Sequence, residues 1–165
     1  MSRYAFVGAV AGLAILLDQL SKWGIRAKVG LYESLPVIDG LFSITHVRNT
    51  GGAFSIFAGA HESWRVPFFV VVAVVAIAVL LHFVRRVAPG QWVVLAALGA
   101  VLGGAIGNMI DRVRFGQVTD FFDAHWRGYH WPTFNVADSF ITVGMLVLIV
   151  HSFFATDEGD ASSQT

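Results

Sequence analysis

The chain has 165 residues, of which 56% are apolar and only 13% are charged. A soluble domain averages about 25% charged residues, so this composition indicates an integral membrane protein. Eleven Lys and Arg balance eleven Asp and Glu, so there is no broad basic surface, and nucleic acid is excluded as a partner. The absence of cysteine excludes disulfides, thiolate nucleophiles and cysteine-ligated metal centres.

Four segments are apolar enough to cross a bilayer, which takes roughly 20 mostly apolar residues in a helix. These segments are residues 4–25, 66–84, 92–110 and 134–155. We interpret the first as a retained helix rather than a cleaved signal peptide, because no small-x-small cleavage site follows Leu17. The third carries small residues that let neighbouring helices approach closely, which predicts an interior helix. They are Gly99, Gly103, Gly104 and Gly107.

An even number of spans puts both termini on one side of the membrane, with residues 27–65 and 113–133 on the other. Most Lys and Arg residues lie on the side of these two loops, so the positive-inside rule applied naively places the termini outside. However, Arg48, Arg112 and Lys22 belong to polar motifs that need them for other reasons. Charge alone therefore leaves the orientation open.

A β-branched and aromatic stretch, residues 41–47, follows the turn signal of residues 36–40 and predicts a small strand element at the membrane surface. The fold class expected is an all-α membrane protein, a four-helix transmembrane bundle with this small β element. We expect one domain over residues 1–155, with a β-cradle around residues 33–60. The acidic, Ser-rich residues 156–165 are expected to form a disordered tail.

Four charged residues stand in or at the ends of the apolar segments, where an ionised side chain costs about 2.5–3.5 kcal/mol at the bilayer centre. They are Asp18, Asp111, Arg112 and Asp138. Such residues either lie near the membrane–water interface or are retained because they take part in a reaction. The structural alternative is that each is locally satisfied: Asp111 by Arg112 or Arg114, Asp18 by Lys22, and Asp138 by capping the fourth helix.

The spacing of the polar residues predicts two polar helix faces. Asn108, Asp111 and Arg112 are at i, i+3 and i+4 in the third segment, and Asn135 and Asp138 are at i and i+3 in the fourth. Each set therefore lines one face of its helix, and the two faces can meet.

A further carboxyl group, Asp120, lies among apolar residues in the segment 118–122, an environment that raises a carboxyl pKa. Two carboxylates that share a desolvated site cannot both ionise easily. One then holds a proton while the other activates water, as in aspartic proteases. Such a pair needs neither a metal nor a cysteine, and we expect no cofactor.

These residues fall in five ordered motifs that resemble those of lipoprotein signal peptidase, the type II signal peptidase of bacteria. The similarity covers nearly the whole chain. The motifs are Asp18–Trp23, Arg48–Ser55, Gly103–Val113, Val118–Phe121 and Phe134–Ser139. One of them alone would be a weak signal, whereas five in order are highly specific.

The resemblance implies a multi-pass aspartyl endopeptidase of the bacterial inner membrane. It would remove the signal peptide of prolipoproteins just before a diacylglyceryl-modified cysteine, with its termini in the cytoplasm and its site facing the periplasm. The expected partners are these lipid-modified prolipoproteins and membrane lipid, and we expect a monomer. In family terms the catalytic pair is Asp120 and Asp138. Asp111 is an alternative to Asp120 as the catalytic partner of Asp138, but the adjacent Arg112 favours a structural role for Asp111.

Other motif residues are expected to support the pair or to bind the substrate. They are Asp18, Lys22, Asn49, Gly51, Asn108, Asp111, Arg112 and Asn135. Thr119 could add a hydroxyl near the pair. The lipid tails of the substrate need a path between helices, which residues 99–107 and the apolar faces of the second and third segments could line.

Three other functions are weighed against this one. A proton-coupled transporter would need carboxylates near mid-span, whereas these lie near one end. A serine/lysine peptidase could use Ser21 or Ser55 with Lys22 or Lys28, but adjacent Ser21 and Lys22 project in different directions on a helix.

The third alternative is a metal site. Asp120, Asp123, His125 and His130 offer hard oxygens and imidazoles that suit zinc or manganese. Their spacing fits no metal-binding motif, so we expect no metal at the catalytic site.

Overall fold

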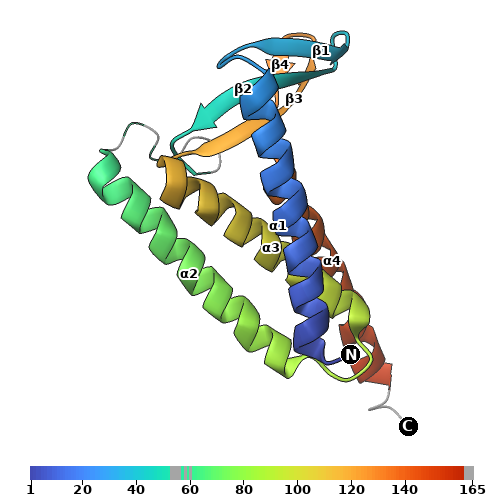
Figure 1. The fold of residues 1–165 in the computed structure, drawn as a ribbon. Helices are drawn as coiled ribbons and strands as arrows, with labels where there is room; N and C mark the ends of the chain where they lie inside the picture. Colours follow the sequence, from blue (N-terminus) through green and yellow to red (C-terminus); the bar gives the residue numbers. More distant parts are fainter. Residues whose placement is uncertain (53–56, 58, 60, 162–165) are drawn as a thin grey trace.

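The computed structural model describes residues 1–52, 57, 59 and 61–161, without the side chains of residues 155–161. Within these ranges it has four helices long and apolar enough to cross a membrane. They are α1 (Arg3–Lys28), α2 (Glu62–Arg86), α3 (Trp92–Phe115) and α4 (Val136–Ala161). The start of α1 and the end of α4 lie at one end of the bundle, and a β-sheet lies at the other (Figure 1).

The helix predicted to be interior, α3, is the most buried of the four. In its most apolar stretch 56% of residues are buried, against 22% in α1 and less in α2 and α4. A Cβ on Gly103 would lie 2.6 Å from the carbonyl oxygen of Ala11 in α1, and one on Gly104 would lie 2.5 Å from that of Ala137 in α4. These glycines therefore serve close helix packing rather than lining a lipid path.

The sheet is four-stranded and antiparallel, in the order β1-β2-β3-β4. Its strands are β1 (Ser34–Ile38), β2 (Phe42–Asn49), β3 (Val118–Trp126) and β4 (Tyr129–His130). The expected element within residues 33–60 is confirmed as β1 and β2, but the fold is not all-α. Half of the strands come from the segment after α3, because β3 finds its pairing partner in β2, far away in the sequence.

The last helix runs to Ala161, past the predicted end of the fourth span at Ala155 and into the segment expected to be disordered. Once a helix is nucleated, each added residue gains a backbone hydrogen bond, so a polar segment can prolong an apolar one. Residues 162–165 lie outside the described residues, as do residues 53–56 of the second motif.

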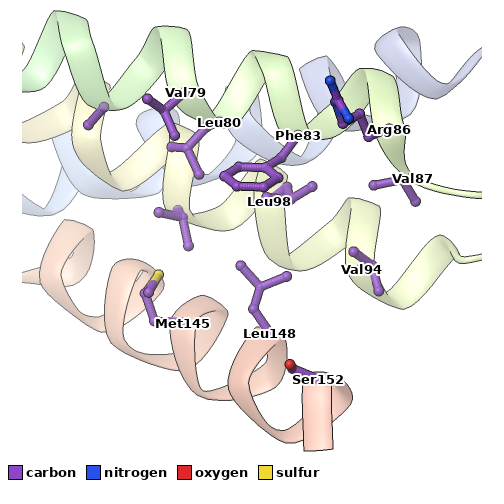
Figure 2. A pocket seen from close by; sticks show the side chains of 12 residues that line it. Val79, Leu80, Phe83, Arg86, Val87, Val94, Leu98, Met145, Leu148 and Ser152 are labelled. Carbon is purple, nitrogen blue, oxygen red and sulfur yellow. The ribbon is translucent and has the colours of Figure 1, made fainter. Parts of the chain in front are cut away.

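A groove of about 620 Å³ lies between α2, α3 and α4 (Figure 2). Its wall is apolar apart from Arg86 and Ser152, and Leu98 and Leu148 contribute from α3 and α4. The groove includes the faces of α2 and α3 that were expected to line a lipid path. It lies toward the end of the bundle that holds the termini, away from the sheet.

Candidate active site

Asp120 on β3 and Asp138 in the first turn of α4 meet at one residue, Asn135. The side-chain Nδ2 of Asn135 donates to Asp120 Oδ1 at 2.6 Å, and its backbone N–H donates to Asp138 Oδ2 at 3.1 Å. Asn135 is fully buried. It therefore fixes the two carboxyl groups relative to each other.

The local sequence explains this arrangement. Asn135 Oδ1 accepts from the backbone N–H of Asp138 at 3.0 Å, and the carboxylate of Asp138 returns to the N–H of Asn135. This reciprocal pair is a capping box, in which two side chains satisfy the free N–H groups at a helix start. Asp138 thus caps α4, as the structural alternative held, and still contributes its second oxygen to the site.

Amides hold the remaining oxygens of the pair. Asn108 Nδ2 donates to Asp138 Oδ1 at 2.8 Å, and Asn49 Nδ2 donates to Asp120 Oδ2 at 3.0 Å. Asn108 Oδ1 in turn accepts from Asn135 Nδ2 at 3.2 Å. The two polar helix faces predicted from spacing therefore do meet, and all four oxygens of the pair accept from neutral amide groups.

Burial and like charge act on Asp120, which is 2% exposed. Burial, followed by the negative charge of nearby Asp138, raises the pKa of Asp120 to about 7, against hydrogen bonds from Asn49 and Asn135 that favour the charged form. Within the described residues neither Asp120 nor Asp138 forms an ion pair with Lys, Arg or His. The pair can therefore hold a proton near neutral pH.

Beside the pair lies a second, ionic cluster made by Asp18, Lys22, Arg26 and Asp111. Lys22 Nζ is 2.9 Å from Asp18 Oδ2 and 3.4 Å from Asp111 Oδ2, and all three side chains are completely buried. Arg26 Nη1 is 3.6 Å from Asp111 Oδ1. The cations that neutralise Asp111 thus come from α1, and not from its neighbours Arg112 and Arg114.

This ionic cluster also joins the elements that carry the pair. Asp111 Oδ2 accepts from the backbone N–H of Thr119 at 3.0 Å, next to Asp120. Asp18 Oδ1 accepts from the N–H of Ala137 at 2.9 Å, next to Asp138. Lys22 Nζ also donates to Asn108 Oδ1 at 2.9 Å. Asp18 and Asp111 therefore hold the backbone on either side of the site.

Arg112 connects the loop after β2 to the helices. Its Nη2 donates to the carbonyl oxygen of Gly51 at 3.0 Å, and its guanidinium lies 4.7 Å from the ring centroid of Phe69 in α2. The backbone N–H of Gly51 donates to Asn49 Oδ1 at 2.9 Å. Arg112 and Gly51 thus set the position of Asn49.

Thr119 lies elsewhere than expected, whereas Ser21 behaves as the helix geometry predicted. The hydroxyl of Thr119 accepts from Arg26 Nη1 at 3.0 Å; it faces the ionic cluster and not the pair, because adjacent residues of a strand point to opposite faces. The hydroxyl of Ser21 donates to the backbone oxygen of Asp18 at 2.8 Å, a local bond that does not pair it with Lys22. Ser55, the other serine considered, lies outside the described residues.

Sequence reasoning missed two contributors, Arg26 and Gln19. Asp18, Lys22 and Arg26 recur at i, i+4 and i+8, a periodicity that could have placed Arg26 on the same face. Gln19 Nε2 donates to Asp18 Oδ2 at 3.0 Å and to the carbonyl oxygen of Gly107 at 3.2 Å. No spacing signal marks Gln19, since it is adjacent to Asp18.

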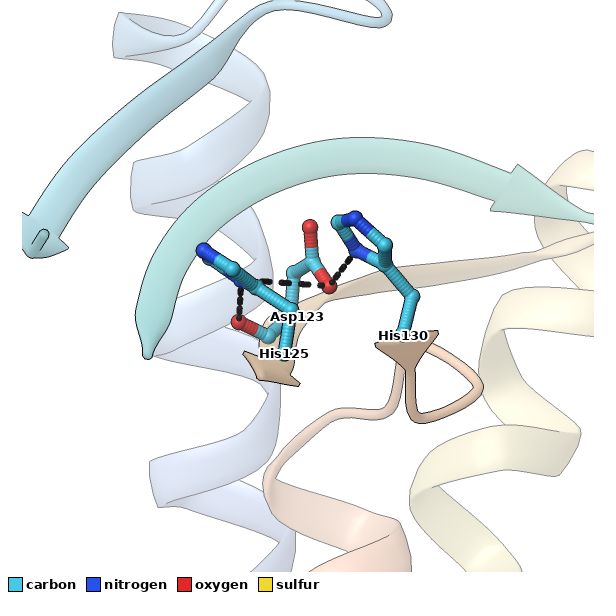
Figure 3. Close-up of side chains that lie close together, drawn as sticks. All are labelled: Asp123, His125 and His130. Atoms are coloured by element: carbon cyan, nitrogen blue, oxygen red, sulfur yellow. Dashed lines mark hydrogen bonds and ion pairs between the residues drawn. The ribbon is translucent and has the colours of Figure 1, made fainter. Parts of the chain in front are cut away.

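The residues proposed as a metal site divide into two groups. Asp123, His125 and His130 come together on β3 and β4 (Figure 3). Asp120 does not belong to this group. Residues at odd separation point to opposite faces of a strand, so Asp120 and Asp123 diverge.

The fold is that of a membrane-type helix bundle with carboxyl groups gathered at one end, and comparison with known proteins gives its class, a peptidase. The model of the signal peptidase (SPase) II family matches residues 10–154. The chain belongs to the signal peptidase II family, whose members are proteases of the membrane.

Named relatives and solved structures are similar over most of the chain. The "Lipoprotein signal peptidase" of Geobacter sulfurreducens is 50% identical over 147 residues, 89% of this chain and 91% of the relative. That of Syntrophotalea carbinolica is 46% identical over 150 residues, 91% and 92% of the two chains. A solved structure described as a bacterial membrane enzyme superposes with a TM-score of 0.82 at 31% identity, covering 91% of this chain and 88% of the other.

Proposed function

We propose that this chain is an aspartyl endopeptidase that cleaves the signal peptide from diacylglyceryl-modified prolipoproteins, just before the lipidated cysteine. Membership of the signal peptidase II family and the names of the relatives support the substrate class. The observation that carries the mechanism is the pair made by buried Asp120 and partly buried Asp138. Among the described residues, each of their four oxygens accepts from an amide group.

The proposed chemistry uses one proton held by the pair. The ionised carboxylate takes a proton from a water molecule as that water attacks the scissile carbonyl carbon. The protonated partner donates a hydrogen bond to the carbonyl oxygen and stabilises the negative charge that develops there. The proton taken from water then passes to the leaving amine as the C–N bond breaks. Because the two sites are coupled, the proton belongs to the pair and not to either residue.

The raised pKa of Asp120 supports this mechanism. A value of about 7 keeps one carboxyl protonated at the pH where the other must act as base. A cation in direct contact would remove that proton by favouring two carboxylates. In the ionic cluster Lys22 and Arg26 contact Asp18 and Asp111 instead, so the adjoining charges are balanced without ionising the pair.

We place the sheet end of the molecule at the periplasmic face of the bacterial inner membrane, with the termini in the cytoplasm. The pair lies at the sheet end of the bundle, opposite both termini. The sheet would then cradle the extended signal peptide beside Asn49 and Gly51, while the modified cysteine keeps its acyl chains in the bilayer. We propose that the enzyme acts as a monomer.

The experiment that tests this function compares two substrates in detergent micelles. A prolipoprotein carrying diacylglyceryl on its cysteine is expected to be cut before that cysteine, and the same polypeptide without lipid is expected to resist. Equal cleavage of both would reject the proposed substrate class. Cleavage at another bond would reject the proposed position of the scissile carbonyl.

A further inference from the structure

Asp123, His125 and His130 form a cluster outside the catalytic pair. Asp123 and His125 are two residues apart on β3 and therefore share one face of the strand. His130 is the antiparallel partner of His125 on β4, which places their side chains next to each other. The candidate ligand atoms of the three residues all lie within 4.8 Å of one another.

The distances within this cluster match what one small ion requires. His130 Nδ1 is 2.9 Å and His125 Nδ1 is 3.9 Å from Asp123 Oδ1 (Figure 3). Tetrahedral Zn²⁺ with bonds of about 2.0–2.2 Å separates its ligand atoms by roughly 3.3 Å. The two separations from Asp123 Oδ1 fall on either side of that value. His125 Nδ1 lies 3.3 Å from the backbone oxygen of Asp123, so the ring of His125 must turn away from that oxygen to bind the ion.

The surroundings fix one ligand and leave room for solvent. The side chain of Asp123 is 9% exposed and that of His130 is 57% exposed. Thr45 Oγ1 donates to Asp123 Oδ2 at 3.4 Å, which leaves Asp123 Oδ1 to face the histidines. Asp123 and His130 also line an open pocket of about 530 Å³. An ion held here could take water as a further ligand from that pocket.

We propose that Asp123, His125 and His130 bind one divalent transition metal ion of the zinc type. Two imidazoles and one carboxylate suit Zn²⁺ and its neighbours in the first transition row. Ca²⁺ and Mg²⁺ instead require a shell of six or more oxygen ligands. On binding, the histidine nitrogens facing the ion must be free of protons, so the His130–Asp123 hydrogen bond is replaced by two bonds to the metal.

The ion would clamp the β3–β4 hairpin and would not take part in hydrolysis. After β4 the chain returns to β3, where the backbone N–H of Phe122 donates to the carbonyl oxygen of Phe134 at 2.8 Å. Phe134 directly precedes Asn135, which holds both catalytic carboxyl groups. A clamp on the hairpin therefore steadies the segment that leads into the site.

The test is a titration of the detergent-solubilised full chain with Co²⁺, followed by its visible absorption, with Zn²⁺ as competitor. We expect one ion per chain, displaced by Zn²⁺. His130→Gln or His125→Gln should weaken the affinity at least about tenfold, since even the loss of an outer partner of a metal ligand costs about 10–100-fold. Zn²⁺ should also raise the Tm of the wild type but not that of His130→Gln.

His82→Gln is the matched control, because His82 lies near the end of α2 and accepts from Arg86 there. Its affinity should equal that of the wild type. Absence of saturable binding, or equal affinity in His130→Gln and the wild type, would overturn the proposal and indicate adventitious binding to exposed histidines. The readout is binding and not turnover, so either outcome leaves the proposed hydrolysis untouched.

Discussion

Two clusters of aspartates lie side by side at the sheet end of the bundle, and they differ in the groups that surround them. In the ionic cluster, Asp18 and Asp111 contact the cation Lys22 at 2.9 and 3.4 Å. In the catalytic pair, the donors to Asp120 and Asp138 within the described part of the chain are all amides. The same side chain, aspartate, therefore serves as a structural anion where a cation contacts it and as a proton-holding acid where neutral amides donate to it.

Replacing one member of the catalytic pair is expected to have the largest effect. Asp120→Asn and Asp138→Asn remove the shared proton but keep shape, so cleavage of the lipidated substrate should fall by on the order of 10⁴-fold, as it does when a member of a catalytic unit is lost. Initial rates in micelles measure this. The Asp120→Asn protein should keep the Tm of the wild type or exceed it, because it removes a charge that burial disfavours.

Asp39→Asn is the control for these variants, because Asp39 is an exposed carboxylate between β1 and β2. Its turnover should match the wild type. Substantial turnover in either variant of the pair would contradict the assignment of roles.

Removing the cation from the ionic cluster should act on stability. Lys22→Met removes the cation that contacts both Asp18 and Asp111 and leaves the two carboxylates buried. Removing one partner of a buried ion pair lowers the free energy of unfolding by about 3–5 kcal/mol. Thermal or denaturant unfolding in micelles measures the change. Lys28→Met, at an exposed position on the same helix, should be close to neutral; equal effects of the two variants would show that the ionic cluster does not stabilise the fold.

The pH dependence of stability separates the two clusters further. Asp120 binds its proton more tightly when folded, with a pKa of about 7, than when unfolded, near 4. Between these values the folded state holds more protons, so the free energy of unfolding falls as pH rises from about 4 to about 7, by up to about 4 kcal/mol. The difference between wild type and Asp120→Asn isolates this contribution, and a difference that does not change over this range would contradict it.

The smallest expected effect comes from one amide donor. Asn49 Nδ2 donates to Asp120 Oδ2 and favours its charged form, so Asn49→Ala should raise the pKa of Asp120 further. The alkaline limb of the pH–rate profile should then move upward by about one pH unit or less. A downward shift would mean that Asn49 favours the protonated form.

Much of this site could be predicted from the sequence, because helical periodicity reports which residues share a face. It placed Asn108 with Asp111, and Asn135 with Asp138, and the two faces do meet through the bond from Asn108 to Asp138. Motif order gave the family, which the family model confirms.

The partners of the buried charges were harder to predict. The local alternatives for Asp111 were Arg112 and Arg114, whereas its cations are Lys22 and Arg26 of α1. Residues adjacent on a helix do not face each other, and the choice among distant partners depends on helix packing that spacing does not encode.

The strand that carries Asp120 was missed for a related reason. Its pairing with β2 joins residues about 70 positions apart, such as Val47 and Asp120. Whether a segment forms a strand depends on the side chains it packs against in the neighbouring strand, and its own sequence does not show these. A second pairing, between β3 and β4, was missed as well, and its register shows that His125 and His130 are opposite each other. Because the strand was not recognised, its alternation of faces, which separates Asp120 from Asp123, was not available to divide the proposed metal site.

The most direct test of a proton held in common is the pH dependence of kcat/KM for the lipidated substrate, which reports on groups of the free enzyme. We predict a bell-shaped curve whose alkaline limb falls near pH 7, where Asp120 loses its proton. A curve that stays level from acid to mildly alkaline pH would show that Asp120 and Asp138 do not share a proton during catalysis.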